Sequence, residues 1–443
     1  MEIPISKAKG LKSSSPFDYY LNSELYVKFQ KNDTFNPFLP SEQTHFLTSI
    51  GVSKRFSWGI QASSKFEILR NRFSPLTFGP KHFEVQWTNE VTVPLLRNLL
   101  GEEDRYLLDS SVRFTEIKTL ETYLDMEDFL FEMLSAYWDW VGAFESFKIS
   151  QEDVSFSAQN VRFFQNKLNT GRANKGDIYS SKAAFQKSLD TSQKLQTQLF
   201  QAERKLQLMS GDQLKQPTVP VMSLETSASY LKLEGPRSVQ NALEARKDWT
   251  RIQLVEREKE EGRNVADWNR WPEVNLFGQI YVKGVETGIG ESIRELKDIN
   301  SGAYIAGLKL KMALFDSEAK SRFEQAASEN LQARYYKSAL LKKISKEVPE
   351  AYLIYQQNFK RVKTVLGQIE FQKKKLDYEK EDYARGRGDS YQIIQANQEL
   401  THARLSLVQA VLETHKSLAL CHKVNGHLLT PYLQFLGEVQ SGK

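Results

Sequence analysis

Residues 82–93 read HFEVQWTNEVTV, and this stretch alternates between apolar and polar side chains. The apolar set is Phe83, Val85, Trp87, Val91 and Val93, and between them lie His82, Glu84, Gln86, Thr88, Glu90 and Thr92. Successive side chains of a β-strand point to opposite faces of a sheet. The stretch therefore predicts a strand with one apolar and one polar face.

Three more stretches alternate in the same way, at residues 52–68, 274–283 and 304–312. Lys54 and Ser64 interrupt the apolar face of the first, and the second face of the other two is less polar. The sequence thus predicts four strands in two pairs, and the pairs lie far apart in the chain.

Between and after the strand pairs the apolar period changes to that of a helix. From Tyr352 onward, apolar residues recur at alternating steps of three and four, at Tyr352, Tyr355, Phe359, Val362, Leu366 and Ile369. This is the seam spacing of a coiled coil, and it resumes after 386–389 with many small residues that allow close helix packing. A helix over 316–383 would reach roughly 100 Å at ~1.5 Å per residue. Residues 117–168 and 178–208 predict a similar pair in the first half, and Pro349 predicts a kink or restart.

The two halves of the chain resemble each other. The corresponding stretches are 93–96 with 312–315, 136–137 with 351–352, and 176–179 with 388–391, at offsets of 219 (313 − 94), 215 (352 − 137) and 212 (389 − 177). Each half reads strand, loop, strand, long helix, glycine turn, long helix, which indicates an internal duplication.

This order divides the chain into an irregular segment, two repeats, a linker and a tail. The boundaries are 1–44 irregular, 45–211 first repeat (strand pair 45–94, helical hairpin 95–210), 212–240 linker, 241–430 second repeat (leading helix 241–270, strand pair 273–312, helical hairpin 316–426) and 431–443 tail. The predicted fold class is α+β, with long antiparallel helical hairpins plus four strands. Two strands per half cannot close a barrel alone, so strands placed in a membrane must be pooled by several copies.

Composition excludes several classes of protein. The chain has 443 residues, of which 40% are hydrophobic and 26% charged, with a mean hydropathy of −0.50. No stretch approaches the ~18 consecutive apolar residues of a membrane-spanning helix. The net charge of +5 comes from 60 basic and 55 acidic residues without a basic block, so we expect no nucleic-acid partner.

No catalytic constellation is visible, and we expect neither an enzyme nor a cofactor or metal. The six histidines form no helical i, i+4 pair beside a general base, and no GxSxG or phosphate-binding loop occurs. Gly288-Ile289-Gly290 lies in a hairpin loop, Arg387-Gly388-Asp389 is read as a helix turn, and Cys421 as a small core residue. Trp58, Trp87, Tyr281 and Tyr304 are candidates for aromatics at a membrane interface or ordinary strand aromatics.

The order of elements and several residues resemble the TolC family of outer-membrane efflux proteins over roughly residues 83–431. The best match is 383–403, where Gly386, Ser390, Ile394, Ala396, Leu400 and Ala403 fit the spacing at the family's periplasmic hairpin tip. Residues 241–243 through 271–274 are similar to the helix that leads into the second strand pair. Residues 304–315, with Ala319 and Ala326, are similar to the strand-to-helix joint.

The resemblance implies a homotrimer with a barrel in the Gram-negative outer membrane and a periplasmic helical tunnel. It implies docking to a periplasmic adaptor protein and to an inner-membrane pump or an ABC transporter, as in efflux or type I secretion. The chain itself would be a passive conduit. The expected periplasmic gate comprises Lys175, Gly176, Asp177, Asp382, Arg385, Gly386, Arg387, Gly388, Asp389, Gln392 and Gln395.

Two departures from the family stand out. The family's signal sequence and leading helix are not visible before the first strand. We expect either a start site assigned too far downstream, which we favour, or a truncated chain. Where some members carry pore-constricting aspartates, this chain has Gln392 and Gln395, so cation selectivity is not expected from the resemblance. The competing hypothesis is a scaffold outside the membrane, with coiled-coil spacers and a small sandwich. The two hypotheses differ in the outward face of the strands. A channel requires that this face be apolar over the thickness of a membrane, and a scaffold does not.

Overall fold

The computed structural model describes residues 8, 14–31, 42–74, 82–171, 173–211, 238–297 and 302–430. These residues form two compact units, one from residues 1–122 and 251–337 and the other from 123–250 and 338–443. The predicted linker at 212–240, except for its last three residues, and the tail at 431–443 lie outside the described residues.

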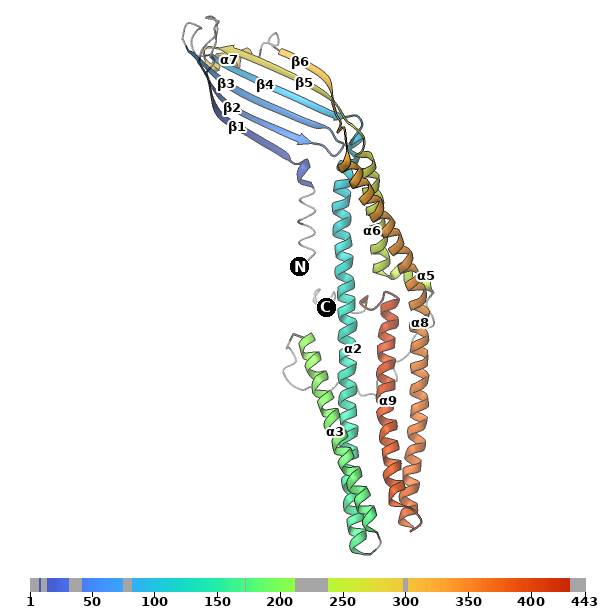
Figure 1. Ribbon diagram of the computed structural model, residues 1–443. Coiled ribbons are helices and arrows are strands. Elements are labelled where there is room, and N and C mark those ends of the chain that lie inside the picture. Colours follow the sequence, from blue (N-terminus) through green and yellow to red (C-terminus); the bar gives the residue numbers. More distant parts are fainter. Residues whose placement is uncertain are drawn as a thin grey trace, which may run out of the picture. The chain divides into compact units, whose positions relative to one another are not determined.

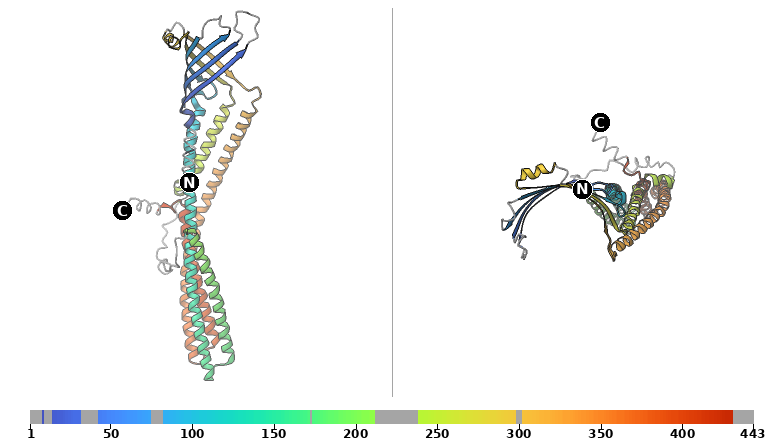
Figure 2. Two further views of the ribbon diagram at one scale, coloured as in Figure 1. Left: turned by 90° about the vertical axis from the view of Figure 1, so that its left-hand side faces the viewer. Right: turned by 90° about the horizontal axis from the view of Figure 1, so that it is seen from above.

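The first unit contains an antiparallel sheet of six strands in the order of the chain (Figure 1). The strands are β1 (Tyr19–Lys31), β2 (Glu42–Arg55), β3 (Gln61–Ser74), β4 (His82–Pro94), β5 (Glu273–Glu286) and β6 (Gly302–Lys311). The sheet is curved, and β1 and β6 lie at its two edges (Figure 2). The short helix α7 (Ile289–Glu295) packs on β4 and β5.

The predicted fold class is confirmed, but the number of strands and the first strand's position are corrected. Residues 52–68 are not one strand, because β2 ends at Arg55 and β3 begins at Gln61. Gly59 has φ of +89° and the amide of Phe56 bonds the carbonyl of Ile60, so a turn separates two strands whose alternation runs in phase through it. Residues 19–31, predicted as irregular, form β1. The Ser-, Pro- and Asn-rich flanks hid an alternation that is clear between Leu21 and Phe29.

Two helices of 68 residues, α2 (Glu102–Asn169) and α8 (Ser317–Ala384), run through both units. Each is followed by a helix of 35 residues, α3 (Lys175–Met209) and α9 (Ser390–Val424). The continuous α8 contradicts a restart at Pro349. Pro349 is exposed, so the carbonyl that loses its backbone donor lies on the solvent side and the helix continues.

The predicted leading helix at 241–270 is two helices, α5 (Val239–Ala245) and α6 (Lys247–Trp268). Arg246 between them has extended backbone dihedrals. Its guanidinium bonds Asp248, Glu347 and the carbonyl of Val424, all at 2.6–3.3 Å. The break therefore occurs where one largely buried guanidinium connects three segments of the second unit.

The duplication is more regular in the structure than the sequence landmarks indicated. Every helix boundary in α8 and α9 follows its counterpart in α2 and α3 by 215 residues (317 − 102). The positive-φ glycines keep this offset, because Gly171 corresponds to Gly386 and Gly211 to Gly426. The offset of 212 that matched 176–179 with 388–391 is therefore wrong for the helix starts, whereas the strands keep no single offset, since β6 ends 217 residues after β4 (311 − 94). The left-handed glycines that end the helices show which residues of the two halves correspond. Gly176 and Gly388 do not correspond, because Gly176 lies inside α3 and Gly388 precedes α9.

The core of the second unit lies along the helix seams. One cluster joins Ile344, Val348, Ala351 and Tyr355 of α8 to Cys421 of α9, together with Ala242 and Val424. Ala396, Ala403 and Ala410 on α9 are completely buried. Small residues at these positions let neighbouring helices approach closely, as the seam pattern predicted.

Candidate functional site

One face of the sheet is mainly apolar. Ile50, Phe66, Trp87 and Val282 are successive register partners across β2 to β5, and each lies on this face. Its exposed large side chains are Tyr19, Leu21, Leu25, Val27, Phe29, Phe46, Ile50, Val52, Trp87, Val91, Leu276, Ile280, Tyr304, Leu308 and Leu310. An exposed apolar surface that crosses six strands marks a contact with lipid or with another protein.

The opposite face of the sheet is polar and internally paired. Lys283 lies 2.6 Å from Glu84, and Lys65 lies 2.7 Å from Glu67. Asn71 connects two imidazoles, with its oxygen 2.5 Å from Nδ1 of His45 and its nitrogen 3.2 Å from Nε2 of His82. Most charged and amide groups of the sheet lie on this face, and Lys54, Arg70 and Asn89 are exceptions on the other. Such a bias suits a wall between water and an apolar medium.

The predicted interface aromatics fall into different places. Trp87 and Tyr304 lie on the apolar face and are exposed, which fits the aromatic positions of a membrane wall. Tyr281 lies on the polar face, opposite Thr88 of β4. Trp58 is in the turn between β2 and β3, where it packs edge-on against Phe56.

The second candidate site is the tip where the short helices begin. Asn174 caps α3 reciprocally with Asp177, since each side chain accepts from the other's amide, at 2.9 and 2.8 Å. Asp389 caps α9 by accepting from the amide of Tyr391. The Ser390 hydroxyl donates to Asp177, so the two helix starts are joined directly. Negative charge at two helix N-termini is favoured by the helix dipoles.

The end of α8 forms a tight glycine turn. The amides of Arg387 and Gly388 both donate to the carbonyl of Asp382, at 3.0 and 3.2 Å. Gly386 has φ of +76°, and a Cβ on Gly388 would lie 2.7 Å from the backbone nitrogen of Tyr383. Both glycines are therefore required by the backbone path.

The structure brings together some of the predicted gate residues and separates others. Asp177 and Asp389 meet at Ser390, and the guanidinium of Arg387 lies 3.5 Å from Asp382. Arg385 instead pairs with Glu381 one turn back. The remaining predicted residues are Lys175 and Gly176 in the first turn of α3, Gln392 in the first turn of α9, and Gln395, which donates to Glu399.

Ser390 and Tyr383 lie in the stretch matched to the hairpin tip, but the predicted gate did not include them. Tyr383 packs against Phe163 and Phe164 and thereby joins α8 to α2. Burial raises the pKa of Tyr383, and Asp177 and Asp389 raise it further. The sequence signal for Ser390 was its position after an N-cap aspartate, but nothing local indicated that its partner lies on the other hairpin.

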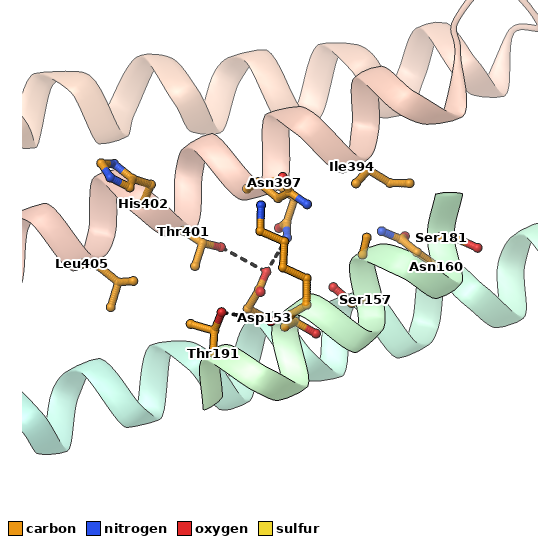
Figure 3. Close-up of a pocket in the computed structure, with 14 residues that line it drawn as sticks. Asp153, Ser157, Asn160, Ser181, Thr191, Ile394, Asn397, Thr401, His402 and Leu405 are labelled. Carbon is orange, nitrogen blue, oxygen red and sulfur yellow. Dashed lines mark hydrogen bonds between the residues drawn. The ribbon is translucent and has the colours of Figure 1, made fainter. Parts of the chain in front are cut away.

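A polar groove of about 200 Å³ lies between α2, α3 and α9, on the tip side of the second unit (Figure 3). The Asp153 carboxylate accepts hydrogen bonds from Asn397 at 2.7 Å and Thr401 at 3.2 Å (Figure 3). Burial raises the pKa of Asp153, and these two hydrogen bonds oppose the rise. This contact also joins the two hairpins, and the sequence analysis did not identify it.

None of the helices in the described ranges is both long enough and apolar enough to cross a membrane. No group of three or more His, Cys, Asp or Glu side chains in the same ranges is arranged to hold a metal ion.

No protein-family model matches this chain, and neither does any curated protein sequence. Solved structures do match. CusC, from a study of folding and transmembrane channel formation, is 14% identical, with a TM-score of 0.69 and coverage of 96% of this chain and 87% of that one. The outer membrane protein VceC of Vibrio cholerae is 12% identical, with a TM-score of 0.68 and coverage of 96% and 91%. The open MtrE outer membrane channel of Neisseria gonorrhoeae is 12% identical, with a TM-score of 0.69 and coverage of 97% and 85%. The chain therefore has the TolC-like fold of outer-membrane channels, with long helical hairpins joined to an antiparallel sheet.

Proposed function

We propose that this chain is the outer-membrane channel component of a tripartite efflux pump, a passive conduit through which solutes cross the periplasm and the outer membrane. The observation that carries the proposal is the two-faced sheet. Its apolar face is exposed across the strands, while its polar face is lined by paired charges. That division is the requirement for a wall with lipid on one side and water on the other.

The protein would act as an oligomer, for which we propose a homotrimer. Within the described ranges β1 pairs only with β2, and β6 pairs only with β5. Unpaired backbone amides and carbonyls cannot remain in lipid, so both edges must find partners on other copies. The long hairpins would then line a shared periplasmic tunnel.

The partners of the helical hairpins would be a periplasmic adaptor protein and an inner-membrane pump. The fold supports this assignment, since the matching structures are outer-membrane channels. An ABC transporter in a type I secretion system is the alternative partner for the same geometry. Export experiments with the matching transporter would distinguish the two systems.

The helical tip would be the periplasmic gate. The link from Ser390 to Asp177 holds the two helix starts together, and the pair of Arg387 with Asp382 stiffens the turn beside them. Opening would require these contacts to separate when the adaptor docks. The proposed gate residues are therefore a subset of those predicted from sequence, with Ser390 added.

The experiment uses two adjacent positions on opposite faces of β5. Ile280, on the apolar face, is 61% exposed, and Gln279 lies on the polar face. We expect Ile280→Arg to remove the protein from the detergent-extracted outer-membrane fraction and Gln279→Arg to leave it there, because only the first places a cation in lipid. Recovery of the unmodified protein in the aqueous fraction would favour the coiled-coil scaffold instead.

A further inference from the structure

The hairpin β1–β2 lies outside the internal duplication. Shifting β3 and β4 by the 215-residue offset of the helices places them over β5 and β6, within a few residues. The same shift places β1 and β2 over 234–246 and 257–270, where the described residues belong to α5 and α6. The sheet therefore consists of two duplicated strand pairs with one additional hairpin at its N-terminal edge.

The additional hairpin has the properties of the other strands. β1 and β2 contain 13 and 14 residues, which exceeds the about 9–11 residues that a tilted strand needs to cross a bilayer. On β1, Leu25, Leu21 and Phe29 are 78%, 69% and 64% exposed, whereas Asn22, Glu24 and Lys28 occupy the other face. The register is in phase with the rest of the sheet. Leu21 is the partner of Val52, and Val27 is the partner of Phe46.

We propose that β1–β2 is part of the membrane wall, and that the outer edge of β1 pairs with the outer edge of β6 of a second copy. Each copy then contributes six strands to the closed barrel. This inference rests on the proposed function, since it assumes that the sheet lies in the outer membrane. The inference can nevertheless fail while the proposed function holds. A wall of β3 to β6 alone would make a barrel from four strands per copy and leave the hairpin outside it.

Strand direction supports this seam. All five pairings are antiparallel, so β1 and β6 run in opposite directions. A β6 edge therefore meets the β1 edge of a copy related by rotation in the antiparallel sense, with the apolar faces continuous. Any number of copies preserves the alternation, because six is even.

The seam determines the width of the pore. Three copies with six strands each make a barrel of eighteen strands. With strands ~4.8 Å apart and tilted by ~40°, its backbone diameter is about 36 Å, against about 24 Å for twelve strands. Barrels of roughly 16–18 strands leave a water-filled lumen. The additional hairpin thus changes the size of solute that the outer opening admits.

The experiment compares two candidate seams by disulfide cross-linking. Cys421 is the chain's single cysteine, so Cys421→Ser provides the background. Leu25 of β1 and Ile68 of β3 lie in one cross-strand row, because both are register partners of Thr48. Leu25→Cys and Ile68→Cys are each combined with cysteines along the apolar face of β6, at Tyr304, Ala306, Leu308 and Leu310, and oxidised in isolated outer membranes.

We expect the Leu25→Cys set to give cross-linked oligomers in at least one combination and the Ile68→Cys set to give none. Cross-links from Ile68→Cys alone, or from neither set in protein that is assembled in the outer membrane, would overturn the six-strand wall and leave the proposed function intact. Absence of every variant and of the Cys421→Ser parent from the outer membrane would instead overturn the proposed function.

A second pair of variants tests the hairpin without cross-linking. Leu25→Arg places a cation on the apolar face of β1, and Tyr26→Arg places one on the polar face. We expect the first to reduce the assembled outer-membrane oligomer by at least about tenfold and the second to leave it within about twofold. Equal amounts of oligomer for both variants would show that β1 does not face lipid.

Discussion

The hydroxyl of Ser390 donates a hydrogen bond of 2.5 Å to Oδ1 of Asp177, although the two residues are 213 positions apart. Asp177 also completes the reciprocal cap of α3 with Asn174, so one carboxylate serves two purposes. The first turn of α9 is thereby held to the first turn of α3. Each helix also has its own N-cap residue, which is Asn174 for α3 and Asp389 for α9.

Loss of this link should loosen the tip. We expect Asp177→Ala to raise the conductance of the channel in planar bilayers, and Ser390→Ala to do so less, because it leaves the cap of α3 intact. Loss of half of the reciprocal cap should also cost α3 about 0.5–2 kcal/mol. Asp190→Ala is the control, since Asp190 pairs with Lys194 on the exposed surface of the same helix. Equal conductance for all three variants would show that the tip does not gate.

Two glycines within helices should respond in opposite ways to alanine. A Cβ on Gly142 of α2 would lie 2.2 Å from Cδ1 of Leu412 on α9, whereas a Cβ on Gly367 of α8 has nothing within 4 Å. We expect Gly142→Ala to destabilise the protein by about 1–3 kcal/mol through overpacking. Gly367→Ala should stabilise it by up to about 1 kcal/mol, because alanine is the better helix former. Thermal unfolding followed by circular dichroism at equal protein concentration checks both, and changes of the same sign would contradict the packing of α2 on α9.

The stability of the second unit should fall as the pH rises toward neutrality. Glu127 on α2 is buried, and its Oε1 has no hydrogen-bond partner among the described residues. Burial raises the pKa of Glu127 from 4.5 to about 7, against the opposing charge of Lys423 and with a further rise from Asp248. The folded state therefore binds more protons than the unfolded state between about pH 4.5 and 7, and stability declines across that window as the pH increases.

The matching substitution is Glu127→Gln. It should remove most of this decline and raise stability at pH 8 by on the order of 1–3 kcal/mol, with a smaller effect at pH 5. Glu132→Gln changes an exposed carboxylate on the same helix and serves as the control. Denaturant midpoints at pH 5 and pH 8 give the comparison. A pH dependence that is unchanged by Glu127→Gln would assign it to other groups.

A buried ion-pair network in the first unit should contribute strongly to stability. Arg113 of α2 lies 2.7 Å from Glu258 and 2.5 Å from Glu261, both on α6. The Tyr106 hydroxyl also donates to Glu258, and burial with the charge of Glu258 raises the pKa of Tyr106 to about 12. Arg113→Ala leaves Glu258 without a cation in a largely desolvated site, although Glu261 keeps its contact with Arg257. We expect a loss of about 3–5 kcal/mol.

Arg322→Ala provides the matched surface control. Arg322 pairs with Glu318 four residues earlier on α8, where both side chains are exposed. Such pairs contribute roughly 0–1 kcal/mol. Unfolding measured in guanidinium and in urea should therefore separate the two variants clearly, and a loss as small for Arg113→Ala as for Arg322→Ala would contradict the network.

Much of the architecture followed from the sequence alone. The period of two at 82–93, 274–283 and 304–312 identified β4, β5 and β6, and the steps of three and four after Tyr352 identified the seam of α8. These features are predictable because a strand or helix that is buried on one face has apolar residues at a regular local spacing. The glycine turn at 386–389 and the matching pair of alanines at 136 and 351 likewise indicated the duplication.

The sequence also contained β1 and β2, but the composition of their flanks concealed them. Leu21, Leu25 and Phe29 alternate clearly once the pairing with β2 is known. The turn at Gly59 could not be located by periodicity, because the five residues between β2 and β3 are an odd number, which keeps the two strands in phase. The number of strands therefore became clear only from the hydrogen-bonded pairing of the strands in the structure.

Other features were decided only by the tertiary structure. Ser390 meets Asp177, and Asn397 and Thr401 meet Asp153, across more than 200 residues of chain. Such contacts depend on which hairpin packs against which and at what rotation. A local sequence pattern records only that a face is buried or polar, and it carries no information about the partner that covers it. For that reason the elements could be predicted from residues alone, whereas the link between the two helix starts required the fold.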